Sequence, residues 1–261
     1  MVFNAPITGI ENEIEFVKYL NGKKGHEIHP IFQQLLENLF PNFTNYNSIN
    51  AWKNNNPQKT DIYIKIKDIT KRISIKKGIK NSVHVEPISE FIHFLIQNNI
   101  SKDVINAYLK YHYADGTNNG TGEKRLSVAE YKIGHEQEIA TINSVFNSKD
   151  LLEKAAERFI LLGRNDKHMV DAVIYGVVND FMWITKEEIK TIIIKQNNIQ
   201  SSAIHFGPLF VQPLARCLNY NPTYEYGRYC VQLKWYNLAD DIIKVMMERK
   251  TMDIRQYHSG S

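Results

Sequence analysis

The stretch DIYIKIKDITKRISIKKG (residues 61–78) carries the clearest fold signal in the chain. Isoleucines alternate with polar residues in both of its halves, at positions 62, 64 and 66 and again at 73 and 75. A period of two is typical of β-strands with one buried face, so the stretch predicts a β-hairpin that turns at DITK. This hairpin places all five isoleucines on one face, and on the other face it places Asp61, Tyr63, Ser74 and Lys76.

The segments on either side of the hairpin show other patterns. Apolar residues at helical spacing predict helices over residues 10–20 and 30–40, and Pro41 stops the second. The asparagine-rich segment 51–60 is interpreted as a loop. Residues 81–86 are predicted to form a third short strand, followed by a helix that begins at Pro87.

The rest of the chain predicts a helical middle and a mixed C-terminal portion. Helices are expected over residues 104–111, 128–146 and 151–162, and the glycine-rich segment 114–124 is expected to be a mobile loop or a domain boundary. Four strands are then expected, over 172–178, 181–185, 203–212 and 229–236. A capping box at Thr185 and Glu188 opens a helix through Ile194, and a last helix covers 238–249. The predicted fold class is α/β.

Composition narrows the class of protein. The 261 residues are 43% hydrophobic and 23% charged, which excludes a mainly disordered chain and suits one large or two modest domains. Apolar runs stay well short of the roughly 20 residues of a membrane helix, and the N-terminus does not resemble a secretory signal. Two cysteines, Cys217 and Cys230, are too few for a disulfide framework or a four-cysteine zinc site. We therefore expect a cytoplasmic protein without a membrane partner.

Positive charge is concentrated around the hairpin. Residues 51–80 contain nine basic and two acidic residues, a net charge of +7. The whole chain has a net charge of +4, so the remaining residues together carry −3. Such a field attracts phosphate and weakens with salt. A solvated lysine-rich face is the alternative, and charge alone does not decide between them.

Several short motifs lack the spacing of a functional site. The histidines of GHEIHP (25–30) are three residues apart, whereas two zinc ligands on one helix face are four apart, and GHEQE (134–138) fails in the same way. The segment GTNNGTGEK (116–124) has a glutamate where a phosphate-binding loop needs lysine. His84-x-Glu86 has no PCxxC partner of the kind that a zinc deaminase needs.

The polar face of the hairpin has the residue types for phosphodiester hydrolysis. This reaction at neutral pH uses a divalent metal, which a carboxylate anchors and beside which a lysine assists the attacking water. An N-terminal helix with a glutamate, a strand that begins with Asp61 and a partner strand that ends in Ser74-Ile75-Lys76 together resemble the PD-(D/E)xK nuclease superfamily. That superfamily includes many type II restriction endonucleases and the archaeal Holliday junction resolvases. The resemblance covers roughly residues 10–95 and implies a restriction-endonuclease-like core, in which helices flank a mixed sheet.

The resemblance assigns roles residue by residue. Asp61 matches the metal-binding aspartate and Lys76 the catalytic lysine, while Thr60 stands where the pattern often has proline. Ser74 stands where an acid is expected, and this departure leaves both an altered metal shell and an inactive relative open. The resemblance implies that a further acid or the backbone carbonyl of Ile75 completes the metal shell. The implied cofactor is Mg²⁺, for which Mn²⁺ can substitute.

Two glutamates are candidates to complete the metal shell. Glu13 follows Ile10 by three residues and precedes Val17 by four, which puts it on the apolar face of its helix. A carboxylate there costs free energy unless it is paired or binds a metal; the alternative is a residue at the edge of the stripe that reaches solvent. Glu86, at the end of the third strand, is the second candidate, with a solvent-facing position before the Pro87 helix as its alternative.

The resulting hypothesis is a Mg²⁺-dependent endonuclease for double-stranded DNA, a type II restriction endonuclease, with Asp61, Ser74, Lys76 and Glu13 in the catalytic site. Residues 1–115 form the catalytic core, and residues 116–261 form a helical plus α/β portion that recognises DNA. Two alternatives stay open: a non-catalytic nucleic-acid-binding module on a decayed nuclease fold, and a structure-selective or phage-defence nuclease. A homodimer is the oligomeric state we consider. The candidate DNA contacts, which otherwise form a polar surface, are Lys59, Lys77, Lys80, Asn81, His84, Arg216, Asn219, Arg228, Gln232 and Lys234.

Overall fold

The chain folds into two compact units, each made of non-consecutive segments. A computed structural model describes residues 8–78, 82–123, 125–164, 167–214 and 222–259, and the side chains of these residues except those of Pro222 and residues 252–259. Unit 1 comprises Met1–Ile79, Leu161–Ile189 and Asn237–Ser261, and unit 2 comprises Lys80–Ile160 and Lys190–Tyr236. The predicted division at residue 115 falls inside the first segment of unit 2, Lys80–Ile160. The reason is topological, because the chain builds part of unit 2 between two strands of the unit 1 sheet.

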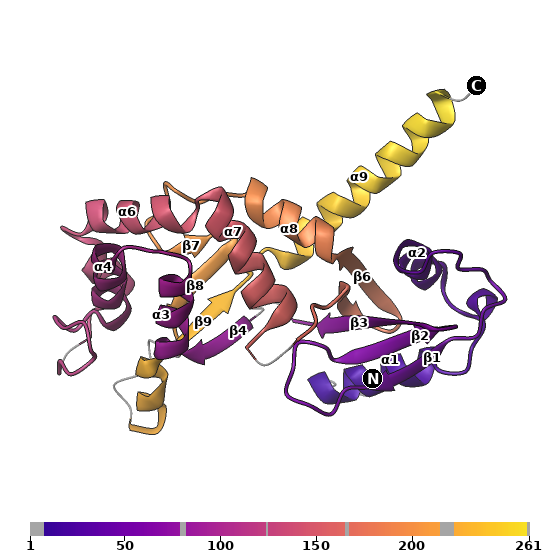
Figure 1. The fold of residues 1–261 in the computed structure, drawn as a ribbon, viewed down its shortest axis with the longest axis horizontal. Helices are drawn as coiled ribbons and strands as arrows, with labels where there is room; N and C mark the ends of the chain where they lie inside the picture. The colour runs from indigo at the N-terminus through magenta and orange to yellow at the C-terminus, as the bar shows by residue number, and fades with distance from the viewer. Residues whose placement is uncertain (1–7, 79–81, 124, 165–166, 215–221, 260–261) are drawn as a thin grey trace, which may run out of the picture. The chain divides into compact units, whose positions relative to one another are not determined.

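Unit 1 is built on a five-stranded mixed sheet in the order β1-β2-β3-β5-β6. The strands are β1 (Asn50–Lys53), β2 (Ile62–Ile66), β3 (Ile69–Lys76), β5 (Ala172–Val177) and β6 (Asp180–Thr185). Strands β3 and β5 run parallel, whereas the other neighbours are antiparallel. The predicted hairpin is confirmed as β2 and β3, which lie side by side in Figure 1.

The hairpin buries its isoleucine face as predicted. Helices α1 (Gly9–Leu20) and α2 (Pro30–Leu39) supply apolar residues to the same core, so these helices cover the isoleucine face. At its centre the ring of Phe32 contacts those of Phe16 and Phe181, with ring centroids 5.8 and 4.2 Å away. The five hairpin isoleucines are at most 8% exposed: Ile62, Ile64, Ile66, Ile73 and Ile75.

Two expectations for unit 1 are wrong. The segment 51–60 is not all loop, because β1 pairs with β2 through residues 50–53. The buried face of α1 is formed by Asn12, Phe16 and Leu20, whereas Ile10 is 61% exposed. Phe16 has a larger apolar surface than any residue in the predicted stripe, so its burial against the core rotates the helix away from that stripe.

Unit 2 contains a four-stranded antiparallel sheet in the order β4-β9-β8-β7, packed against helices. Its strands are β4 (Ser82–Pro87), β7 (His205–Phe206), β8 (Leu209–Pro213) and β9 (Cys230–Lys234), and its helices include α3 (Ile88–Gln97), α4 (Lys102–Tyr113), α5 (Val128–Lys132), α6 (Glu136–Phe146) and α7 (Lys149–Ala155). Its core is aromatic. Phe91 contacts the rings of Tyr108, Phe146 and Phe159.

The helical middle differs from the prediction in two places. The predicted helix 128–146 is interrupted between α5 and α6, where Gly134 has a positive φ of 81°. The predicted helix 151–162 changes its hydrogen bonding at Ala156 and continues as a π-helix to Leu162.

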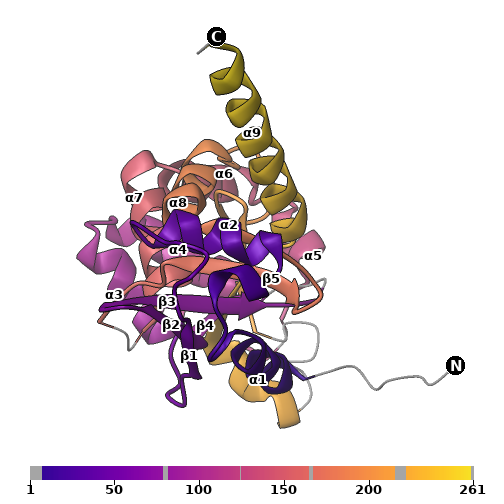
Figure 2. The same ribbon diagram turned by 90° about the vertical axis from the view of Figure 1, so that its right-hand side faces the viewer.

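The two last helices begin in unit 1. The predicted capping box is confirmed at the start of α8 (Lys186–Lys195), where Glu188 and Thr185 exchange hydrogen bonds. Helix α9 (Leu238–Ser259) starts beside β6 and extends away from the sheet (Figure 2). Its Arg249 donates to both carboxylate oxygens of Glu188 and lies 3.6 Å from the ring centroid of Trp183. No helix within the described residues is both long and apolar enough to span a membrane.

Candidate active site

The candidate active site lies at the start of β2, on the sheet face opposite the isoleucines. The backbone N–H of Asp61 donates to the Ile73 carbonyl, which holds Asp61 in register beside Ser74 on the neighbouring strand. Residues two apart on a strand share a face, so Ser74 and Lys76 both point to the side of Asp61. The alternating pattern in the sequence therefore predicts this grouping correctly.

The polar side chains form a short chain of hydrogen bonds. Lys76 Nζ donates to Ser74 Oγ at 2.8 Å, and Ser74 Oγ donates to Asp61 Oδ2 at 2.9 Å. The backbone N–H of Ile75 donates to the same Oδ2 at 2.5 Å, and Lys76 Nζ lies 3.5 Å from it. The side chains of Lys76 and Asp61 keep 25% and 18% of their surface exposed. The site therefore joins a carboxylate and an ammonium group that solvent and ligands can reach.

The oxygens of this site suit a hard cation in part. Mg²⁺ prefers oxygen ligands, and proteins commonly hold it with one or two carboxylates together with substrate phosphates and water. Asp61 provides one carboxylate, and every hydrogen bond that the described residues make to it ends on Oδ2, which leaves Oδ1 for a ligand. The Ile75 carbonyl accepts from Lys76 Nζ at 3.2 Å, so it faces the same place. The described residues contain no group of three acids, histidines or cysteines arranged for a metal.

Glu13 has a basic partner in the structure. Its carboxylate lies 2.6 Å from Lys53 Nζ, and the side chain is 15% exposed. The position is half-buried at the flank of α1, because the helix turns Asn12 and Phe16 toward the core. The predicted location on the core-facing stripe is therefore wrong, and the carboxylate is neutralised by Lys53 of the edge strand.

Glu86 belongs to unit 2, where Oε2 is paired and Oε1 is buried without a hydrogen-bond partner among the described residues. Its side chain is 0% exposed, and Arg158 Nη2 donates to its Oε2 at 2.6 Å. His84 Nε2 lies 3.0 Å from the same oxygen, and the His84 ring packs on Phe159 with centroids 5.2 Å apart. The expected solvent-facing alternative is wrong for Glu86, and the contacts give both residues a role inside unit 2.

The other predicted DNA contacts are dispersed. In unit 1, Lys59 and Lys77 are half-buried, and the stem of Lys59 packs over Gly163. In unit 2, Gln232 and Lys234 are half-buried on one face of β9; Gln232 hydrogen-bonds with Gln212 and Ser82. Four predicted contacts lie outside the described residues: Lys80, Asn81, Arg216 and Asn219.

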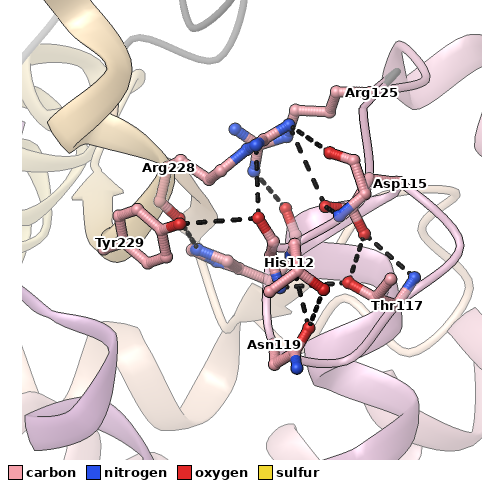
Figure 3. A network of polar contacts seen from close by, with 10 residues as sticks. His112, Asp115, Thr117, Asn119, Arg125, Arg228 and Tyr229 are labelled. Atoms are coloured by element: carbon pink, nitrogen blue, oxygen red, sulfur yellow. Dashed lines mark hydrogen bonds and ion pairs between the residues drawn. The ribbon is translucent and has the colours of Figure 1, made fainter.

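Arg228 has structural partners (Figure 3). Its guanidinium donates to the carbonyls of Gly120 and Gly122, at 3.2 and 3.1 Å, and lies 3.9 Å from Asp115. Only 13% of its side chain is exposed. These bonds clamp the segment 114–123 to the 3₁₀-helix Pro222–Tyr229, so Arg228 has little surface for DNA and the predicted mobile loop has a defined conformation.

Asp115 organises that loop. Its Oδ1 accepts from the Thr117 backbone and hydroxyl, and its Oδ2 accepts from the Gly122 backbone. Burial acts to raise the pKa of Asp115, but the hydrogen bonds from Thr117 and Gly122 and the charge of Arg228 outweigh it, so the pKa is lower than the ordinary value. A Cβ at Gly122 would lie 2.1 Å from the Asp115 carbonyl oxygen, which explains a glycine there.

Two residues on the active-site face, Trp52 and Arg72, were not singled out in the sequence. They lie on either side of Tyr63 and pair with it, in the row next to Asp61 and Ser74. Trp52 was hidden by the interpretation of residues 51–60 as loop.

Comparisons with known proteins agree with the fold. No protein-family model matches the sequence, and no curated protein is detectably similar to it. A crystal structure of the restriction endonuclease MspI in complex with its cognate DNA has a similar fold, with a TM-score of 0.53 over 87% of this chain and 91% of the MspI chain. The two sequences are 12% identical. The protein thus has a mixed α/β, restriction-endonuclease-like fold, which confirms the predicted fold class.

Proposed function

We propose that the protein is a metal-dependent endonuclease for double-stranded DNA, of the type II restriction kind. The observation that carries the proposal is the group of Asp61, Ser74 and Lys76 on the polar face of the hairpin, within 3.5 Å of one another. The similarity in fold to MspI, whose structure contains DNA, supports it. The basic segment 51–80 supports a phosphate-bearing partner.

The oxygens of Asp61 and Ser74 and the carbonyl of Ile75 are the groups that would hold Mg²⁺ or Mn²⁺. When bound, the cation would neutralise charge on the phosphate and activate water for attack. Among the described residues Asp61 provides the one carboxylate of this site, so the phosphate of the substrate would contribute to the shell. Metal affinity without DNA is therefore expected to be weak.

Lys76 has the position of the group that assists the reaction. Its ammonium donates to Ser74 Oγ and lies beside the Asp61 carboxylate, which keeps the positive charge at this point of the sheet. From there the ammonium can orient a water and stabilise the negative charge that develops on the phosphate. Ser74 links the two groups and limits how far Lys76 moves.

The test is digestion of plasmid and phage DNA with Mg²⁺, in parallel with EDTA. Cleavage that requires Mg²⁺ and gives a defined set of bands supports the proposal. Asp61→Ala under the same conditions shows whether the activity belongs to this site. Intact DNA under all Mg²⁺ and Mn²⁺ concentrations contradicts the proposal.

Ser74 favours a second candidate, a DNA-binding relative without nuclease activity. A serine in place of an acid removes a negative charge from the site, which lowers the attraction for a divalent cation. This candidate predicts binding of duplex DNA without cleavage. A third possibility, a structure-selective or phage-defence nuclease, predicts Mg²⁺-dependent cleavage without a defined set of bands.

A further inference from the structure

A row of three side chains lies next to the candidate active site. Trp52 of β1, Tyr63 of β2 and Arg72 of β3 are paired directly across the three strands. Directly paired residues project from the same face of a sheet. Tyr63 follows Asp61 by two residues and Arg72 precedes Ser74 by two, so the row lies on the active-site face. Its distance from Asp61 and Ser74 along the strands is about 7 Å.

The aromatic part of this row is exposed. The rings of Trp52 and Tyr63 stack with centroids 5.3 Å apart and an interplanar angle of 20°, and Trp52 is 41% exposed. An indole this exposed leaves apolar surface in contact with water, which costs free energy. Exposed aromatic side chains beside charged groups are typical of surfaces that bind nucleic acid whose bases are unstacked, and the bases pack on the rings.

The polar atoms of the row are available. Among the described residues, none hydrogen-bonds to the Arg72 guanidinium, the Tyr63 hydroxyl or the Trp52 indole N–H. Asp171 accepts a hydrogen bond from the backbone N–H of Arg72 but not from its side chain. Arg249 differs from Arg72, because its guanidinium donates to Glu188 and stacks on Trp183. Arg72 is half-buried and positioned by its strand, so it loses little freedom when it binds an anion.

We propose that Trp52, Tyr63 and Arg72 form a binding row for the DNA strand on one side of the phosphate that is cut. Arg72 binds a neighbouring phosphate, and the stacked rings pack against the sugar attached to it or against a base that is unstacked there. The inference rests on the proposed nuclease function, because it takes the Asp61 site as the place of cleavage. The role of the row is to position the DNA strand. DNA is favoured as the ligand because the row combines the Arg72 guanidinium with aromatic surface.

The test measures binding separately from cleavage. A fluorescein-labelled duplex that carries a cleavage site mapped on plasmid DNA is titrated in EDTA, by fluorescence polarisation, at several NaCl concentrations. Arg72→Gln should weaken binding and reduce the slope of log K against log[salt] by about 0.9, the value for one phosphate contact. Trp52→Ala should weaken binding about fivefold or more and leave the slope unchanged.

Matched variants distinguish the row from general effects. Lys18→Gln removes one exposed charge from α1, which covers the isoleucine face, and Tyr46→Ala removes an aromatic side chain that is 80% exposed. Both should bind DNA as the wild type does. Arg72→Lys should keep the salt slope, and Trp52→Phe should recover part of the affinity, which shows that a loss does not come from misfolding.

The outcomes separate this inference from the proposed function. If the wild type cleaves DNA and both Arg72→Gln and Trp52→Ala bind normally, the binding row is overturned and the nuclease proposal stands. A loss with Arg72→Gln alone overturns the part assigned to the aromatic stack. If the wild type neither binds nor cleaves duplex DNA, both proposals fall.

Discussion

Polar side chains in unit 2 and on the active-site face of unit 1 are satisfied in different ways. In unit 2, Glu86 is buried against Arg158, and Arg228 is bound to loop carbonyls. In unit 1, Lys76 and Asp61 are a quarter and a fifth exposed, and the Arg72 guanidinium has no partner among the described residues. Polar groups with internal partners stabilise a fold, whereas polar groups that keep capacity for a ligand are candidates for chemistry. The residue types are the same in both units, so the difference lies in their surroundings.

The largest expected effect concerns the candidate active site of unit 1. Lys76→Ala should lower the cleavage rate by about 10²–10⁴-fold, because it removes the group that assists proton transfer and stabilises charge. Asp61→Ala should abolish cleavage. Initial rates on plasmid DNA measure both effects. Urea unfolding should show Lys76→Ala within about 1 kcal/mol of the wild type and Asp61→Ala lower by about 1–3 kcal/mol, because the Ile75 N–H and the Ser74 hydroxyl lose their acceptor. Near-wild-type cleavage at low Mg²⁺ by either variant would remove these residues from the mechanism.

The second effect concerns the buried ion pair of Glu86 and Arg158 in unit 2. Glu86→Ala should lower the free energy of unfolding by about 3–5 kcal/mol, because it leaves the Arg158 guanidinium without its buried partner. Urea denaturation measures the loss. Glu153→Ala, an exposed glutamate of α7, is the control and should change stability by about 0.5 kcal/mol or less. A Glu86 variant that folds normally but needs more Mg²⁺ for cleavage would return Glu86 to the metal site and break the comparison.

A smaller, pH-dependent effect is expected from the loop clamp, the contacts of Asp115 and Arg228 that hold the segment 114–123. The pKa of Asp115 is lowered in the folded state, so its charged form stabilises the fold above the pKa of the unfolded chain, and this contribution is lost as pH falls through the folded pKa. Asp115→Asn should therefore cost about 1–2 kcal/mol at neutral pH, and the difference from wild type should shrink in acid. Thermal unfolding over a pH series tests this. The exposed Asp68→Asn should show no such pH dependence; equal curves for the two variants would contradict the role of the clamp.

The smallest effect is expected at Glu13. Its ion pair with Lys53 is partly exposed, so Glu13→Gln should cost no more than about 1 kcal/mol of stability and leave the Mg²⁺ dependence of cleavage unchanged. Cleavage rates over a Mg²⁺ series provide the measurement, with Glu15→Gln on the same helix as the control. If Glu13→Gln alone is slow at low Mg²⁺ and recovers at high Mg²⁺ or with Mn²⁺, the sequence-based hypothesis of a metal ligand is supported instead.

The sequence predicts a substantial part of this molecule because some signals are local. Alternation in the hairpin specifies both the strand pair and the faces, and it brings Asp61, Ser74 and Lys76 together without further information. The capping box at Thr185 and Glu188 is equally local. The position of Glu13 on its helix was predicted wrongly because the face of a helix that becomes buried depends on what it packs against. Here Phe16 meets Phe32 and Phe181, and their contact outweighs a regular stripe of smaller residues.

Hairpin register, fold class and the composition of the candidate site were thus determined by the order of residues along the chain. Only the tertiary structure decided which acids and arginines are free for a ligand. Glu86 meets Arg158, 72 residues away, and Arg228 meets Gly120, 108 residues away. Partners that distant are chosen by the packing of whole elements, and burial then makes the pairing obligatory, because an unpaired charge in the interior is too costly to keep.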